Sequence, residues 1–233
     1  MKHRLFTLVE LLTVIAVIAI LAGIAVPVVV GMQSKGRETS ARADMNAIKI
    51  ALTQFKADYS IWPQVSPDNS LKTKIGDDYA DVLIETPYSP TSSLSKAEEA
   101  YDKIIEALTY NKVDSSTPTN PSNNYGNTKK RRYCDPPAKP VETKNPKSGG
   151  GYLTGFYKLD PWGRRYNIAL DWNYNGKIDL SSSYKFEQGE EKNAILGQIL
   201  IYSFGTATNA AKSGEDDDFD SDAFLCSWKT NAN

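Results

Sequence analysis

The stretch that decides the fold is FTLVELLTVIAVIAILAGIAVPVVV, residues 6–30. Apart from Pro27, the only residues in it that are not apolar are Thr7, Glu10, Thr13 and Gly23. An α-helix rises about 1.5 Å per residue, so a helix of this length would cross a hydrocarbon core of roughly 30 Å. The stretch therefore predicts a membrane-spanning helix.

Glu10 is the unusual residue of this stretch. A carboxylate in apolar surroundings costs about 2.5–3.5 kcal/mol on insertion scales. No Lys, Arg or His follows Glu10 until Lys35. We therefore expect its cationic partner to precede it in the chain or to belong to another molecule.

The five residues before the stretch, MKHRL, are basic and contain no acid. By the positive-inside rule this end stays in the cytoplasm and the bulk of the chain is exported. Two other interpretations remain open, a cleaved secretory signal peptide and an ordinary signal anchor. The length of the apolar run, and the polar Thr7 and Glu10 near its start, argue against a cleaved signal peptide.

The sequence FTLVELL (residues 6–12), between a short basic leader and an apolar run containing Pro27, resembles the class III signal of type IV pilins and type II secretion pseudopilins. The resemblance implies that a prepilin peptidase cuts between Leu5 and Phe6 and methylates the new amino group. It also implies that Phe6, Glu10 and Pro27 belong to an assembly helix, in which the amine of Phe6 on a neighbouring subunit neutralises Glu10. Leu5 departs from the family pattern, which has Gly before the cut.

An amphipathic helix is predicted after this stretch, followed by a head domain. Apolar residues recur at spacings of three and four, at Ala41, Met45, Ile48, Leu52, Phe55 and Tyr59. Pro27, Gly31 and Gly36 predict a flexible or locally melted section of the helix, and Trp62-Pro63 its end. The predicted organisation is a leader (1–5), a transmembrane and assembly helix (6–30), an amphipathic half of the stalk helix (31–62) and a periplasmic globular head (63–233).

The head is predicted to combine one helix with a small sheet. Residues 63–94 suggest a surface connection, and residues 111–151 a mobile or extended loop. A helix is predicted over 96–110, with Ser95 and Glu98 as an S-x-x-E capping box. Strands are predicted over 166–170, 177–180 and 194–204, the first two joined by a hairpin through Asn175-Gly176. The predicted fold class is α+β and type IV pilin-like: a long N-terminal helix packed on a small C-terminal antiparallel sheet, with large loops.

Two motifs in the last third, D-P-W-G at 160–163 followed by Tyr166, and Y-S-F-G at 202–205, resemble the head of the major pseudopilins of type II secretion systems. This resemblance implies a structural subunit that polymerises into a helical filament and drives protein export across the outer membrane. The implied partners are minor pseudopilins, the inner-membrane assembly platform and the prepilin peptidase. The implied location is the bacterial inner membrane, single-pass, with a cytoplasmic N-terminus and a periplasmic head.

An acidic run, residues 215–222, holds six carboxylates. Oxygen ligands in a flexible loop suit calcium. The resemblance implies Asp217 and Asp218 as calcium ligands, with the carbonyl of Phe204 as a third. Ala207 stands where the family has another Asp, and the candidates to replace that carboxylate are Asp216, Asp220 and Asp222. A solvated acidic loop without calcium is the alternative.

A second calcium candidate comes from spacing. Asp171, Asn173, Asn175 and Asp179 match the first nine positions of an EF-hand loop, but Ser182 stands where its bidentate Glu belongs. We interpret this segment first as a β-hairpin turn.

Composition excludes several functions. The formal net charge is −1 and the pI about 5.9, so nucleic acid is not an expected partner. The basic run at 129–132 is interpreted as a solvated patch, with binding of nucleic acid or an anionic surface as the alternative. The only histidine, His3, lies in the leader, and neither a P-loop nor a G-x-S-x-G motif is present, so we expect no enzyme.

Cys134 and Cys226 lack metal-type spacing and are a disulfide candidate, with two buried thiols as the alternative. Two other functions also remain open. One is a type IV pilin subunit for adhesion, motility or DNA uptake. The other is a membrane-anchored calcium-binding protein that does not polymerise.

Overall fold

The computed structural model describes residues 8–64, 72–75, 78–86, 96–144, 152–179, 194–206 and 224–227. The chain divides into two compact units, Met1–Ser40 and Ala41–Asn233. Helix α1 (Leu8–Tyr59) contributes residues to both units.

The described part of the first unit is helical. Every side chain from 8 to 24 is exposed, and the aliphatic ones among them range from 52% exposed at Val14 to 78% at Leu8. The hydroxyl of Thr13 donates to the Glu10 carbonyl at 3.0 Å, within the helix itself. Among the described residues, no helix combines the length and apolarity that a membrane crossing requires.

The local melting of the helix predicted near Pro27, Gly31 and Gly36 is wrong, while the flexibility predicted as its alternative stays a prediction. The backbone is α-helical without a break from Leu8 to Tyr59, through Pro27, Gly31 and Gly36. A proline removes one backbone hydrogen bond. The regular turns on both sides of Pro27 offset that single loss.

In the second unit, α1 presents the predicted apolar stripe to the core. Ala41, Met45, Ile48, Leu52 and Phe55 are buried, and Tyr59 is partly buried against them. The helix stops where Ser60 takes a left-handed conformation (φ 59°) and its N–H donates to the Lys56 carbonyl at 2.7 Å. The indole of Trp62 then donates to the Asp171 carbonyl at 2.8 Å, which fixes the chain after the helix to the sheet.

The main sheet is antiparallel, with five strands in the order β1-β2-β5-β8-β9. Its strands are β1 (Lys72–Ile75), β2 (Asp78–Ile84), β5 (Asn167–Leu170), β8 (Ile199–Ser203) and β9 (Leu225–Cys226). Ile84, Ile168 and Ile201 lie side by side in one row across the central strands. The next row, Leu83, Ala169 and Leu200, faces the other side, as the two-residue period of a strand requires.

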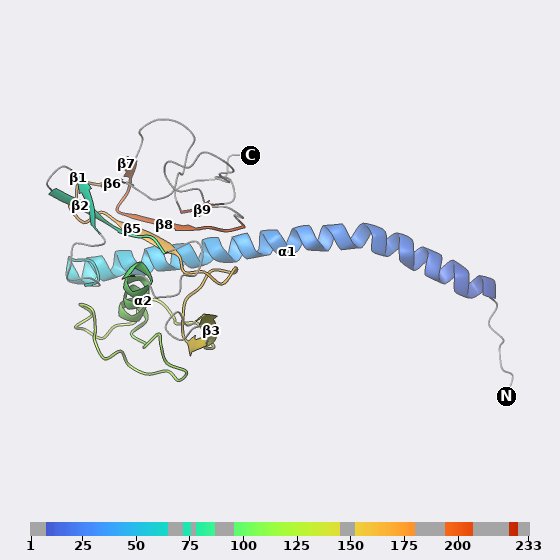
Figure 1. Cartoon of the computed structure of the whole chain (residues 1–233), viewed down its shortest axis with the longest axis horizontal. Coiled ribbons are helices and arrows are strands. Elements are labelled where there is room, and N and C mark those ends of the chain that lie inside the picture. The colour runs from blue at the N-terminus through green and yellow to red at the C-terminus, as the bar shows by residue number, and fades with distance from the viewer. Residues whose placement is uncertain are drawn as a thin grey trace. The chain divides into compact units, whose positions relative to one another are not determined.

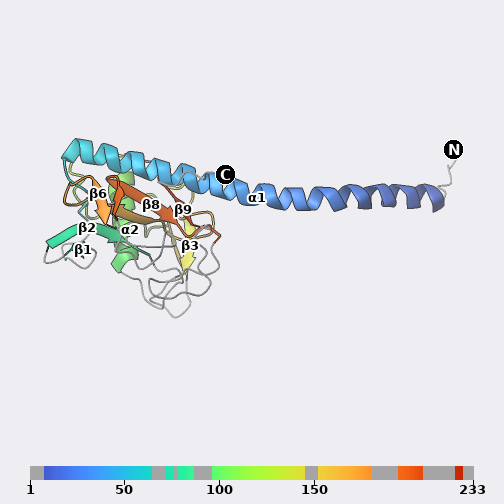
Figure 2. The same cartoon turned by 90° about the horizontal axis from the view of Figure 1, so that it is seen from above.

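These rows belong to two separate hydrophobic cores. The large core contains the Ile84 row, the stripe of α1 and the buried face of α2 (Lys96–Thr109). The small core, on the opposite face, consists of Ala169, Ile178, Leu200, Tyr202, Phe204, Phe224 and Cys226. Figures 1 and 2 show the C-terminal part of α1, in light blue, running beside β8 and β5.

The α+β class, the helix at 96–109 and the antiparallel sheet confirm the coarse prediction, but three details are wrong. The segment predicted as a surface connection, 63–94, contains β1 and β2, and Val82 and Ile84 are buried. The segment predicted as one loop, 111–151, contains β3 (Val141–Lys144), which pairs with β4 (Tyr152–Gly155).

The third detail concerns the strand predicted over 194–204, which is two strands. Gly197, at φ 148°, separates β7 (Ala194–Leu196) from β8. β7 pairs with β6 (Lys177–Asp179) in a sheet of its own, while β8 pairs with β5. The predicted hairpin between β5 and β6 is therefore wrong, because the two strands pair with different partners. The positive φ of Gly197, which glycine adopts readily, lets the chain pass from β7 in one sheet to β8 in the other.

Candidate functional site

The D-P-W-G motif forms a tight turn around the buried carboxylate of Asp160. Asp160 Oδ1 accepts hydrogen bonds from the backbone N–H of Trp162 at 3.0 Å and of Arg164 at 2.8 Å. The Gly163 N–H donates to the Asp160 carbonyl at 2.9 Å, and Gly163 has φ 84°, which favours glycine. Aspartate, proline and glycine thus occupy positions that the turn itself selects.

The second motif is hydrogen-bonded to the first. Ser203, the last residue of β8, donates its hydroxyl to Asp160 Oδ2 at 2.6 Å and accepts the Gly205 N–H at 3.0 Å. Burial raises the pKa of Asp160 above its ordinary value of 3.8, while the hydrogen bonds from Ser203 and the turn favour the ionised carboxylate. The two motifs therefore form one buried polar unit.

The acidic segment (residues 207–223) leaves and rejoins the fold at a single place. The rings of Phe204 and Phe224 lie 5.5 Å apart, and Ser203 pairs with Leu225 across β8 and β9. We call these four residues the base of the acidic segment. Asp216, Asp217 and Asp218 lie outside the described residues, as do Asp220 and Asp222. The ring of Phe204 is buried in the small core, so only its backbone remains as a ligand candidate.

The loop at 171–176 uses its oxygen atoms to fold itself. The carboxylate of Asp171 accepts the N–H of Asn175 at 3.1 Å and of Gly176 at 2.9 Å. Asn173 Oδ1 accepts the Asn175 N–H at 3.0 Å, and Asn175 Oδ1 accepts the Lys177 N–H at 2.8 Å.

Calcium binding by this loop stays a prediction, and the hairpin turn was the preferred interpretation. Burial lowers the pKa of Lys56, whereas the negative charge of Asp171 raises it. The ammonium of Lys56 therefore already interacts with the buried acid of this loop. The side chain of Asp179 and all of Ser182 fall outside the described part. Across the described ranges, no three His, Cys, Asp or Glu side chains are placed to share a metal ion.

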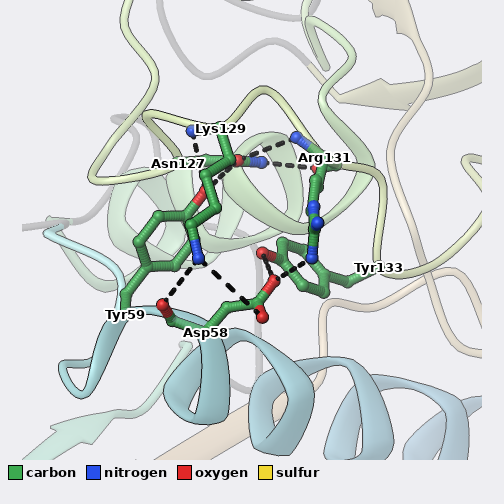
Figure 3. A network of polar contacts seen from close by, with 6 residues as sticks. All are labelled: Asp58, Tyr59, Asn127, Lys129, Arg131 and Tyr133. Atoms are coloured by element: carbon green, nitrogen blue, oxygen red, sulfur yellow. Dashed lines mark hydrogen bonds and ion pairs between the residues drawn. The ribbon is translucent and has the colours of Figure 1, made fainter.

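The basic run is anchored to the end of α1 by a polar network (Figure 3). Arg131 Nη1 donates to Asp58 Oδ2 at 2.9 Å, and Lys129 Nζ donates to the Asp58 carbonyl at 3.0 Å. The hydroxyl of Tyr133 donates to the same Oδ2 at 2.8 Å. Hydrogen bonds from Tyr133 and Arg131 lower the pKa of Asp58, although burial opposes them. The run is therefore part of an ordered contact with the helix.

Comparison with known proteins identifies a relative of this chain. The chain is 29% identical over 106 residues to the type II secretion system core protein G of Escherichia coli (strain K12). The match covers 46% of this chain and 66% of that protein, slightly less than two thirds of its length. The comparison supports a type II secretion pseudopilin, a type IV pilin-like protein. No family model matches the chain, and no solved structure matches it significantly.

The printed name of the relative is that of a core protein of a secretion system, which is consistent with the prediction that the chain is not an enzyme. Of the processing and assembly residues predicted for a pseudopilin, Leu5 and Phe6 lie outside the described residues. Glu10 is exposed in the first turn of α1. Pro27 lies inside the helix, and its side chain is not among those described.

The two cysteines of the chain are not joined by a disulfide. Cys134 packs at the margin of the large core and Cys226 lies in the small core, on the opposite face of the sheet. Burial raises the pKa of Cys134 to about 11. The disulfide candidate is therefore wrong for the described structure.

Sequence reasoning missed a buried ion pair next to the D-P-W-G turn. Arg165 donates Nε to Asp102 Oδ1 and Nη2 to Asp102 Oδ2, both at 2.8 Å, and Nη1 to Glu98 Oε1 at 3.2 Å. Two acids four residues apart on α2 were the available signal, because such a pair lies on one helix face. This contact joins α2 to the turn, and it occupies the Glu98 side chain that was predicted to cap the helix.

Proposed function

We propose that the chain is a structural subunit of a type II secretion pseudopilus that polymerises through α1 and drives protein export across the outer membrane. The similarity to a type II secretion core protein supports this function. The proposal includes a single-pass location in the bacterial inner membrane with the head in the periplasm, and assembly with other secretion components. The observation that carries the polymerisation is the exposed apolar surface of α1.

That surface needs another molecule to cover it. Five large side chains, Leu8, Val9, Leu11, Leu21 and Ile24, are each at least 60% exposed. They lie on all sides of the helix, because successive residues are about 100° apart around its axis. Burying one such side chain contributes about 1.5–3 kcal/mol. A helix that is apolar all round is stable in lipid or inside a bundle of helices, and not in water.

Glu10 gives the bundle its register in this proposal. The prepilin peptidase cuts between Leu5 and Phe6, and the new amine of Phe6 on one subunit pairs with Glu10 of its neighbour. An acid within an apolar helix costs about 2.5–3.5 kcal/mol, so the pairing favours copies that are offset to bring the two charges together.

Replacement of Glu10 by alanine tests the proposal. We expect Glu10→Ala to abolish filament assembly in cells, measured by electron microscopy of sheared filaments and by chemical cross-linking. The thermal unfolding of the head should be unchanged, because Glu10 lies outside the second unit. Glu38→Ala, an acid on the same helix, is the matched control and should still assemble. Normal filaments from the Glu10→Ala variant would refute the proposal.

We further propose that the acidic segment binds calcium through Asp217 and Asp218, with Asp216 and the Phe204 carbonyl completing the set. The closed base, held by Ser203, Phe204 and Phe224, supports this because it brings both ends of the segment together. Calcium would supply a hard cation that relieves repulsion among the carboxylates.

Titration of the protein with calcium, followed by calorimetry, should give saturable heat and a higher melting temperature. Asp217→Asn/Asp218→Asn should abolish both. Asp171→Asn, in the other candidate loop, should keep the heat of binding. A wild-type protein without heat or thermal shift would exclude calcium.

A further inference from the structure

Asn175 and Gly176 form the only Asn-Gly pair in the sequence. In such a pair no side chain shields the backbone nitrogen of the glycine, so this nitrogen can attack the side-chain amide of the asparagine. Gly176 has φ 79°, and a Cβ placed on it would meet no atom within 4 Å. Asn175 is exposed. The two groups that react in the deamidation of an asparagine are therefore adjacent and open to water.

The amide of Asn175 is held beside the nitrogen that would attack it. Its Oδ1 accepts the N–H of Lys177 at 2.8 Å. The ring that this hydrogen bond closes contains the Gly176 nitrogen, so the bond restricts how far the Asn175 Cγ can turn away from that nitrogen. A donor at the amide oxygen also stabilises the negative charge that develops there when a nucleophile adds to Cγ. This contact therefore both positions and polarises the group under attack.

A buried carboxylate contacts the proton that the attack must remove. Asp171 Oδ2 accepts the Gly176 N–H at 2.9 Å. This distance is within the reach of about 2.6–3.2 Å that a general base requires. Asp171 Oδ1 accepts the Asn175 N–H at 3.1 Å, so hydrogen bonds fix both oxygens of the carboxylate in the loop.

The backbone of Asp171 and of Gly176 is anchored to neighbouring segments. The Asp171 N–H donates to the Gln198 carbonyl at 3.0 Å, and the Trp62 indole donates to the Asp171 carbonyl at 2.8 Å. The Gly176 carbonyl accepts the Gly197 N–H at 3.0 Å. The base and the nucleophile are therefore held in place before any reaction begins, which is the condition that accelerates intramolecular reactions.

We propose that the folded loop catalyses the deamidation of its own Asn175, with Asp171 as the general base. The Gly176 nitrogen forms a bond to Asn175 Cγ while its proton passes to the Asp171 carboxylate. The Cγ–Nδ2 bond then breaks, and Nδ2 takes up that proton and leaves as ammonia, so that a cyclic imide remains. Water opens the imide at either carbonyl, which gives aspartate or isoaspartate at this position.

The reaction changes the charge of an exposed loop. A carboxylate replaces a neutral amide next to Asp171. The aspartate product still has an oxygen that accepts the Lys177 N–H, whereas isoaspartate lengthens the backbone and moves the Gly176 N–H relative to Asp171. The reaction consumes only water and needs no second copy of the chain, so it is independent of filament assembly.

The folded and the unfolded chain are compared to test the proposal. The full chain is incubated at neutral pH in detergent, and in parallel in guanidinium chloride. EDTA is present in both, so that no metal ion competes for Asp171. Peptide mass spectrometry follows the conversion of Asn175. We expect conversion about ten-fold or more faster in the folded chain, since a general base contributes about 10²–10⁴-fold. An equal or slower rate in the folded chain overturns the proposal.

Two variants of Asp171 test its role as the base. Asp171→Asn should lower the folded-state rate to that of the unfolded chain, because an amide does not take up the Gly176 proton. Asp171→Glu keeps the charge but moves the carboxylate away from that N–H, and it should also lower the rate. Asp114→Asn, at an exposed acid outside the loop, is the matched control and should react like the wild type.

Melting temperatures show whether each variant is folded. A wild-type rate in folded Asp171→Asn overturns the proposal, and Asp171→Glu decides in the same way if the first variant does not fold. Asn175→Gln should give no conversion at this position, because its side chain would have to close a larger ring. Asn173, which is exposed in the same loop and precedes the bulky Tyr174, should stay intact. Equal conversion of Asn173 and Asn175 would show unspecific hydrolysis and would overturn the proposal.

Discussion

The buried carboxylate of Asp160 connects the two motifs of the candidate site through hydrogen bonds. Its two oxygens accept three hydrogen bonds, two from its own turn and one from Ser203 on β8. A buried acceptor that loses its donor costs the full desolvation of that group, about 1–3 kcal/mol and more when it is charged. The link to Ser203 therefore matters for the stability of the head.

At this scale we expect Ser203→Ala to lower the free energy of unfolding by about 1–3 kcal/mol. The pKa of Asp160 is already raised by burial, and loss of the Ser203 donor raises it further. In the folded state, the Asp160 carboxyl group of the variant therefore stays protonated to higher pH than that of the wild type. Its deficit in stability should therefore be smallest in acid and grow as pH rises through the two folded-state pKa values.

Urea unfolding of the full chain in detergent, repeated at several pH values, measures this effect. Thr53→Ala is the control, because its exposed hydroxyl bonds only to the Lys49 carbonyl of its own helix. A deficit that does not change with pH would contradict the role given to Asp160.

At the scale of the elements, β4 packs closely against the chain that follows α2. A Cβ on Gly155 would lie 2.1 Å from the Val113 carbonyl oxygen and 2.8 Å from the Tyr157 ring. The same carbonyl accepts the Phe156 N–H at 2.7 Å. The chain after α2 and the end of β4 are therefore held at a separation that only glycine permits.

Gly155→Ala should accordingly destabilise the head by about 2 kcal/mol or more, since backbone must move to admit a methyl group. Gly36→Ala is the matched control: its Cβ meets nothing within 4 Å, and alanine is the better helix former by about 1 kcal/mol. Thermal unfolding compares the two. Equal melting temperatures for Gly155→Ala and the wild type would show that the strand shifts without cost.

For the second unit as a whole, the sheet separates two hydrophobic cores that no covalent link joins. Cys134 belongs to the margin of one core and Cys226 to the other. A disulfide requires Cβ atoms about 4 Å apart, and two side chains on opposite faces of a sheet do not meet that requirement.

Reducing agent should consequently leave the melting temperature of the head unchanged. A native disulfide would contribute about 2–4 kcal/mol, which corresponds to a shift of several degrees. Thermal scans with and without dithiothreitol measure this, and titration of thiols in the unfolded chain should find both cysteines reactive. A clear drop in melting temperature on reduction would contradict the arrangement.

Helical elements could be predicted from the sequence because their signals are local. The spacing from Ala41 to Tyr59 identified the face of α1 that is buried, and the pattern after Ser95 identified α2 to within one residue. Strands were harder. β2 begins at Asp78, directly after Asp77, and also contains Asp81. These acids suggest a loop, yet Val82 and Ile84 are buried through pairing with β5.

The partners within the candidate site could not be predicted because they depend on tertiary distance. The motifs at 160–163 and 202–205 identified Asp160 and Ser203 separately, and the hydrogen bond between them spans 43 residues. Likewise, nothing in the basic run indicates that Asp58 accepts two of its four cations. The interpretation as a solvated patch agrees with the exposure of all four side chains, but the two contacts with Asp58 could not be predicted from charge alone.

The contacts at the base of the acidic segment make this segment a suitable place to insert a foreign peptide. Phe204 packs against Phe224, and Ser203 pairs with Leu225. These contacts fix the two ends of the acidic segment. In general, doubling the length of a loop adds only about 0.6 kcal/mol of closure entropy. An epitope tag or a foreign peptide inserted between these two ends should leave the pairing of β8 with β9 and both cores undisturbed.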